Sequence, residues 1–176
     1  KNEIDLLRAD IPEITEIPVI KFMEAKEIIM KKFKYQPSDM KDFDPEEEQM
    51  LGKYAKKQFN SDFIFVTHYP SKKRPFYTMD DPEDPEYTLS FDLLFRGMEI
   101  TSGGQRVHDY NAQVEKMKRL GMNPEEFDTY LMLHKYGAPP HGGLGLGLER
   151  LTMHLLGFKN VREAAMFPRD INRVTP

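Results

Sequence analysis

The chain has 176 residues, of which 39% are hydrophobic and 31% charged, and its formal net charge at pH 7 is −4. This length and apolar content suffice for one domain with its own core. The net negative charge excludes a protein that binds nucleic acid or an anionic membrane through overall positive charge, so a phosphate-bearing ligand must meet local basic residues. There is no cysteine, which excludes disulfides and thiolate metal sites. Without a long apolar run or a signal-like N-terminus, we expect a cytoplasmic protein that does not enter a membrane.

The N-terminal third predicts a connector and two helices. Prolines interrupt residues 1–21, which we interpret as a connector that ends in a short strand, Val19–Lys21. Apolar residues at helical spacing predict a helix over residues 22–33. Asp44, followed by proline and by Glu47 at the capping-box position, predicts the start of a second helix. The side chains expected to face inward from this helix are Met50, Leu51, Tyr54, Ala55 and Phe59.

The middle of the chain predicts strands. The apolar run at 62–67 has strand length, and residues 69–86 are rich in proline and charge, so they predict a loop with one short strand at 76–78. The segments 89–95 and 98–107 have strand character and are separated by only two residues. This tight spacing predicts that they are antiparallel neighbours.

The C-terminal third predicts two capped helices and then a strand that leads into a helix. Asp109 caps a helix through Leu120, and Asn123 begins the next helix. A glycine-rich strand over 142–149 then leads directly into a helix, 150–156, which ends at Gly157. Because strands come in hairpins and helices come separately, we expect one α+β domain with an antiparallel sheet flanked by helices.

The glycine-rich strand is the most unusual segment. Glycine at every second position leaves one strand face without side chains, at an entropic cost, while leucines occupy the other face. Close approach of a flat ligand is one reason to accept that cost, and tight packing of another part of the protein is an equal alternative. No lysine follows as in a P-loop. Arg150 can stack on a ring or neutralise phosphate, although an ion pair with Glu149 is the commoner role of a lone arginine.

A polar cluster lies on the preceding hairpin. Glu99 and Ser102 are three residues apart, and a bulge or bend there would turn both oxygens toward one point. With Asp92 and nucleotide phosphates they would suit Mg²⁺, which uses few protein ligands. Arg106 has the fork geometry for a substrate carboxylate. The alternative is that Glu99 and Arg106 are ordinary surface charges on neighbouring strands.

Several motifs together resemble a known family. The segment 145–150 (GLGLER) resembles motif 3 of class II aminoacyl-tRNA synthetases, and its lead-in, 136–143 (YGAPPHGG), resembles subclass IIb, in which His141 points to the aspartyl and asparaginyl branches. Residues 90–108 and 166–176 are similar to aspartyl-tRNA synthetases of the archaeal and eukaryotic type. Residues 22–176 therefore correspond to the C-terminal half of that catalytic domain, with motif 3 but without motifs 1 and 2.

The resemblance implies ATP-dependent activation of L-aspartate to aspartyl-adenylate and its transfer to tRNA, with Mg²⁺, in a homodimer. It implies that Glu99 contacts ATP and Mg²⁺, that Ser102 binds Mg²⁺ and lines the amino-acid site, and that Asp92 lies near the metal. It implies that Arg106 binds the aspartate side chain. It further implies ATP contacts for Gly147, Leu148, Glu149 and Arg150, with Arg150 and Glu99 as the catalytic pair.

Three alternatives stay open. They are an asparaginyl-tRNA synthetase, a synthetase-like asparagine synthetase, and a synthetase-derived binding module without catalysis. Because motifs 1 and 2 are missing, we expect this 176-residue piece alone not to activate aspartate. All of these catalytic readings require the head of Arg150 to lie near Glu99 and Arg106.

Overall fold

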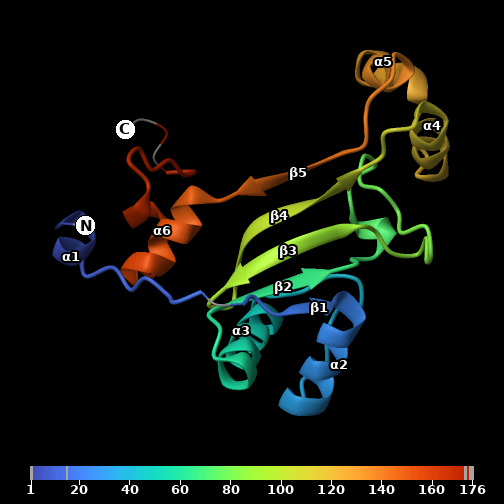
Figure 1. Ribbon diagram of the computed structural model, residues 1–176. Helices are drawn as coiled ribbons and strands as arrows, with labels where there is room; N and C mark the ends of the chain where they lie inside the picture. The colour runs from blue at the N-terminus through green and yellow to red at the C-terminus, as the bar shows by residue number, and fades with distance from the viewer. Residues whose placement is uncertain (1, 15, 173, 175–176) are drawn as a thin grey trace.

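The chain folds around one five-stranded sheet, in the order β1-β2-β3-β4-β5 (Figure 1). The computed structural model describes residues 2–14, 16–172 and 174. The strands are β1 (Val19–Lys21), β2 (Phe63–Thr67), β3 (Ser90–Phe95), β4 (Met98–Arg106) and β5 (His141–Leu146). β1 and β2 are parallel, and every other neighbouring pair is antiparallel. The expected α+β architecture is confirmed, except that the edge pair β1–β2 is parallel.

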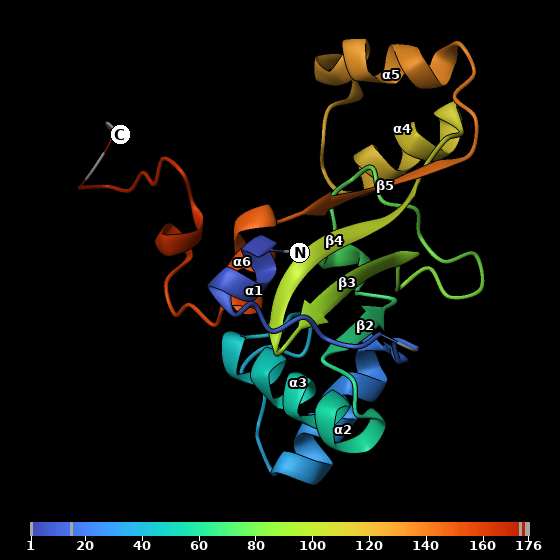
Figure 2. The same cartoon turned by 60° about the vertical axis from the view of Figure 1, so that its left-hand side comes forward.

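Two helices, α2 (Phe22–Phe33) and α3 (Pro45–Phe59), pack under β1, β2 and β3 (Figures 1 and 2). The capping box at the start of α3 is present, since Asp44 accepts from the N–H of Glu47 and Glu47 accepts from that of Asp44, both at 2.9 Å. Lys26 of α2 is fully buried, and its Nζ lies 2.6 Å from Glu47 Oε1. This internal ion pair joins the two helices. The expectation for Phe59 was wrong, because its side chain is 48% exposed at the end of α3.

The remaining elements lie beyond the two ends of the sheet. One group, α4 and α5, lies at one end of β4 and β5, and the other, α1 and α6, lies at the opposite end (Figures 1 and 2). The bounds are α1 (Asn2–Leu7), η1 (Ser71–Lys73), α4 (Tyr110–Arg119), η2 (Pro124–Phe127), α5 (Asp128–Lys135), α6 (Leu148–Leu156) and η3 (Val161–Ala164). None of the helices in the described ranges is long and apolar enough to cross a bilayer.

Three local predictions need correction. Residues 1–21 were interpreted as a connector, but they contain the short helix α1 as well as β1. The strand expected at 76–78 is reduced to an isolated bridge between Thr78 and Arg106. Helix α6 begins at Leu148 and so includes Arg150 in its first turn.

A close contact between two glycines joins α3 to the β3-β4 hairpin. The turn consists of Arg96 and Gly97, with φ of 51° and 80°, as a two-residue hairpin of this kind requires. A Cβ added to Gly97 would lie 2.7 Å from the Cα of Gln49, and a Cβ added to Gly52 would lie 2.6 Å from the Cα of Gly97. The backbone of α3 therefore touches the turn directly, which fixes the start of β4.

We expect Gly52→Ala to lower the free energy of unfolding by about 1–3 kcal/mol, because the added methyl must push α3 away from the turn. Urea denaturation measures this. Gly145→Ala is the matched control, since a Cβ there meets nothing within 4 Å. Equal stability of the two variants would contradict the proposed contact.

Candidate active site

A one-residue bulge in β4 places the polar residues of the hairpin on one face of the sheet. Leu93 is opposite Thr101 and Leu94 is opposite Glu99, so Ile100 has no opposite residue. Asp92 lies opposite Ser102. Because Asp92 and Leu94 are two residues apart in β3, their partners Ser102 and Glu99 share that face too. In a regular strand, residues three apart would point to opposite faces.

Both peptide groups of Glu99 are held by side chains from helices. Its N–H donates to Glu48 Oε2 of α3 at 3.0 Å. Its carbonyl accepts from Arg150 Nη1 of α6 at 2.7 Å, and the same nitrogen lies 3.9 Å from the Glu99 carboxylate. Arg150 thus pairs with Glu99 and not with its neighbour Glu149. Burial, and then the charge of Asp92, raise the pKa of Glu99, while Arg150 and other cations lower it.

Arg74 forms the centre of the cluster, and sequence reasoning missed it. Its Nη2 donates to Asp92 Oδ2 at 2.7 Å and its Nη1 to Ser102 Oγ at 3.1 Å. Its guanidinium stacks on the ring of Tyr69, 3.8 Å from the centroid. Lys72 and Lys73, which precede it, are exposed. In this charged, proline-rich loop, no sequence pattern distinguishes Arg74, which points inward, from the two lysines before it.

The face of β5 without side chains adjoins this cluster. Gly145 is opposite Ser102, and Gly143 is opposite Gly104, which puts the β5 glycines on the face that carries Ser102. A Cβ at Gly143 would meet the guanidinium of Arg106 at 3.4 Å, and one at Gly145 would meet nothing within 4 Å. At Gly147 a Cβ would meet the side chain of Arg150, at 3.5 Å. Gly143, Gly145 and Gly147 therefore form a strip without side chains, the glycine strip, which has Arg106 at one end and Arg150 at the other. Its middle, at Gly145, is free of neighbouring atoms.

A cavity of about 370 Å³ lies over this strip. Arg106, the expected fork for a carboxylate, stands in its wall and stacks on Tyr77, with 4.3 Å between the guanidinium carbon and the ring centroid. Other lining residues are Arg74, Ser102, Gly143 and Gly145. The cavity is thus lined by guanidinium groups, a hydroxyl group and backbone atoms that no side chain covers. The structure places Asp92, Glu99 and Ser102 on one face of the sheet, with Arg106 at one end of the glycine strip and Gly147 and Arg150 at the other. The side chains of Leu148, Glu149 and Arg150 are exposed.

The donor set fits a nucleotide-bound Mg²⁺. Asp92 Oδ1 is buried and accepts no hydrogen bond of regular geometry, although the Tyr69 hydroxyl lies close enough to Asp92 for burial and then that charge to raise the pKa of Tyr69. Glu99 is a half-buried carboxylate whose pKa is raised by burial and by Asp92. Across the described ranges, no three acidic or histidine side chains converge on one point. Mg²⁺ typically takes one or two protein carboxylates and completes its shell with water and phosphate oxygens, so two carboxylates and a hydroxyl are sufficient.

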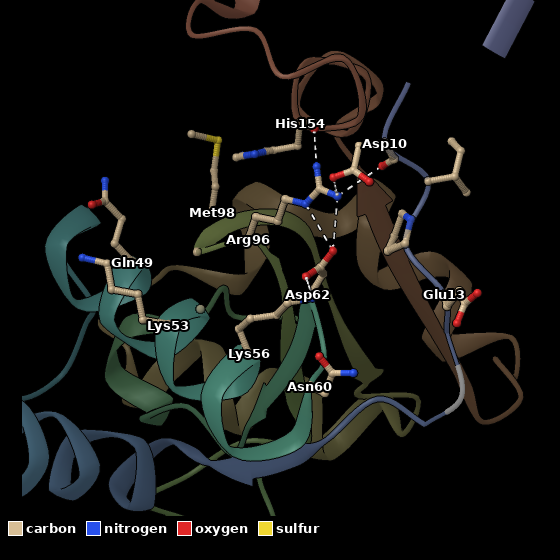
Figure 3. Close-up of a pocket in the computed structure, with 14 residues that line it drawn as sticks. Asp10, Glu13, Gln49, Lys53, Lys56, Asn60, Asp62, Arg96, Met98 and His154 are labelled. Atoms are coloured by element: carbon tan, nitrogen blue, oxygen red, sulfur yellow. Dashed lines mark hydrogen bonds and ion pairs between the residues drawn. The ribbon is translucent and has the colours of Figure 1, made fainter. Parts of the chain in front are cut away.

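A second cavity, of about 690 Å³, surrounds the β3-β4 turn and shows how α6 is anchored (Figure 3). Arg96 points to three partners at once: the carbonyl of His154 at 2.8 Å, Asp10 Oδ2 at 2.6 Å and Asp62 Oδ2 at 3.2 Å (Figure 3). A cation at the C-terminal end of a helix is favourable because carbonyls there lack partners. Arg96 thereby fixes the helix whose first turn carries Arg150.

We expect Arg74→Met to lower the free energy of unfolding by about 3 kcal/mol, because it leaves the buried Asp92 carboxylate without its cation. Urea denaturation at pH 7 checks this. Lys31→Met, which removes an exposed pair with Glu27, is the control and should change stability little. A variant at Arg74 as stable as that control would show that the pair is not needed.

Asp62 should make stability depend on pH. Burial raises the pKa of Asp62, but hydrogen bonds from Lys56 and Arg96 outweigh burial, so the pKa lies below its ordinary value. Its stabilising contribution is therefore complete above the unfolded pKa of about 3.9 and is lost as the pH falls through the folded-state value. We expect the stability difference between wild type and Asp62→Asn to be large at pH 7 and to shrink below pH 4. A difference that is constant with pH in urea titrations would be the contrary result.

Comparisons with known proteins identify the family of the chain. The family model described as tRNA synthetases class II (D, K and N) matches residues 2–171. The aspartate–tRNA(Asp/Asn) ligase of Thermus thermophilus is 51% identical over 99% of the chain, and the aspartate–tRNA(Asp) ligase of Pyrococcus furiosus is 43% identical over the whole chain. The chain spans only 41% and 40% of those two proteins.

Solved structures give the same assignment. An aspartyl tRNA synthetase from Entamoeba histolytica superposes with a TM-score of 0.85 at 38% identity, over 91% of this chain and 33% of that one. An asparaginyl-tRNA synthetase from Pyrococcus horikoshii, complexed with asparaginyl-adenylate, gives 0.84 at 34% identity, over 99% and 40%. The chain therefore belongs to the class II tRNA synthetases of the D, K and N group.

Proposed function

We propose that the complete protein containing this chain is an aspartate–tRNA ligase. The observation that carries the proposal is the open glycine strip between Arg106 and Arg150, on the sheet face that also presents Asp92, Glu99 and Ser102. Aspartyl-adenylate carries a carboxylate at its amino-acid end, a phosphate in its middle and a flat adenine at its other end, so it suits a bare strip with a guanidinium at each end. Relatives that are named aspartate–tRNA ligases and are 42–51% identical to the chain support the choice of aspartate.

Arg106 would bind the side-chain carboxylate of aspartate, since a guanidinium forms two parallel hydrogen bonds with a carboxylate. Stacking on Tyr77 restricts its rotation, so less entropy is lost when the substrate binds. Ser102, in the same cavity, would line the amino-acid site. This arrangement would leave the α-carboxylate free to approach the nucleotide.

ATP would lie along Gly147, Leu148 and Glu149, with Arg150 against the adenine or the γ-phosphate. An oxygen of the aspartate α-carboxylate attacks the α-phosphorus, and the bond from that phosphorus to the bridging oxygen breaks. Pyrophosphate leaves with the electron pair, and no proton is transferred. The protein contributes positioning and charge neutralisation, and Glu99 and Arg150 would act as the catalytic pair.

Mg²⁺ fits this scheme, and Glu99, Ser102 and Asp92 would hold it. When bound, it supplies positive charge to the phosphate oxygens. Asp92 already carries Arg74 on one oxygen, which leaves the other for a second cation.

In the second reaction a ribose hydroxyl at the end of the tRNA attacks the adenylate carbonyl carbon. The bond from that carbon to the phosphate oxygen breaks, AMP leaves with the electron pair, and the hydroxyl proton is released. We propose tRNA for aspartate as the acceptor, a homodimer as the assembly and the cytoplasm as the location. The strongest competing function is an asparaginyl-tRNA synthetase, which the likeness to the Pyrococcus horikoshii structure favours. The positive charge of Arg106 suits a carboxylate better than an amide.

The test is ATP–pyrophosphate exchange by the complete gene product with aspartate or asparagine. We expect exchange with aspartate only, and a loss of at least about a hundredfold in kcat/KM in Arg106→Met and in Arg150→Met. Lys57→Met, an exposed change on α3, is the control. Exchange with asparagine but not aspartate would refute the proposal. The 176-residue chain alone should show no exchange.

A further inference from the structure

We propose that Glu48 is a positioning residue that holds the Glu99 peptide in place for nucleotide binding. The inference rests on the proposed function, which gives Glu99 its role. Its basis is the hydrogen bond from the N–H of Glu99 to Glu48 Oε2, 3.0 Å long and formed between residues 51 positions apart. Glu48 does not itself contact the nucleotide in this proposal. It acts through Glu99.

The Glu99 peptide needs such a partner because the neighbouring strand stops short of it. β5 ends at Leu146, which is opposite Thr101, and the next N–H along, that of Gly147, bonds the carbonyl of Ile100. Glu99 precedes Thr101 and Ile100 in β4 and so lies beyond the last residue of β5 that could pair with it. Its N–H therefore goes to Glu48 and its carbonyl to Arg150. The position of a peptide group without strand partners depends on the side chains that bond it.

The packing of α3 explains why Glu48 reaches this point. Glu48 precedes Gly52 by four residues, so both lie on one face of the helix. Gly52 touches Gly97 in the β3-β4 turn, and a Cβ at either position would collide with backbone. This contact presses the helix face that carries Glu48 against the first residues of β4. The hydrogen bond is thus set by a rigid contact between two backbones.

Two other roles are possible for an acid at this position. The first turn of α3 also carries Glu46 and Glu47, and acids there stabilise a helix through its dipole. Alternatively, Glu48 could itself hold a cation together with Glu99. The positioning role needs only a hydrogen-bond acceptor, the dipole role needs only a charge, and the cation role needs a carboxylate. Glutamine and methionine separate these requirements, since they have similar size and no charge, but only glutamine retains an acceptor.

The experiment compares Glu48→Gln with Glu48→Met in the complete gene product, with Glu46→Met as a control, since Glu46 is exposed in the same turn. Hydrogen exchange of the Glu99 amide and the KM for MgATP in pyrophosphate exchange are the readouts. In Glu48→Met we expect at least tenfold faster amide exchange and a KM for MgATP raised by about ten- to a hundredfold. The KM for aspartate should change little. Glu48→Gln and the control should resemble wild type.

Each contrary result overturns the inference. Equal losses in the Gln and Met variants would assign a charge or a carboxylate role to Glu48. Wild-type behaviour in both would show that Glu99 needs no such partner. If Glu48→Met does not fold, Glu48→Ala takes its place as the variant without an acceptor, and loss of amide protection in Glu48→Gln refutes the inference. If wild type shows no aspartate-dependent exchange, the proposed function fails, while the amide measurement still tests the role of Glu48.

Discussion

The arrangement of the polar residues depends on one extra residue in β4. Without the bulge at Ile100, Glu99 and Ser102 would lie on opposite faces of the sheet, and the carboxylates could not gather. The residue just before the bulge carries a structural cost, because β5 ends at Leu146 and leaves the N–H and carbonyl of Glu99 without strand partners. Two side chains from helices on the two sides of the sheet replace the missing hydrogen bonds: Glu48 of α3 accepts from the N–H, and Arg150 of α6 donates to the carbonyl. Glu99, the residue beside the bulge, thus joins two distant helices to the site.

Charge on this face is balanced before any ligand arrives. Arg74 forms an ion pair with Asp92, and Arg150 forms one with Glu99, so each of these two carboxylates already has a cation beside it. Arg106 has an aromatic ring as its partner and remains open to an anion. The charged groups of the site are held in place by the fold. They therefore do not have to reorient when a ligand with developing charge is bound. The backbone strip adds a surface that brings a flat ligand close to these charges.

Sequence reasoning succeeded where the deciding interactions are local. The capping box at Asp44, the hairpin around a two-residue turn and the helix end at Gly157 depend on residues within a few positions of each other. It failed where partners are distant, since nothing near Arg74 or Glu48 distinguishes them from exposed neighbours. Periodicity also misplaced Phe59, because a helix face extends beyond the sheet that covers it. The roles given to the site residues are proposals.

The glycine strip has a consequence for inhibitor design. A compound bound across it would contact main-chain atoms, which are the same whatever the sequence, so resistance could arise there only by adding bulk at Gly143 or Gly145. A Cβ at Gly143 would already be in van der Waals contact with the guanidinium of Arg106, so a larger side chain there would displace Arg106 as well as the compound. Selectivity between related enzymes would have to come from groups that reach the loop carrying Arg74 and Tyr77, where side chains instead of peptides form the wall.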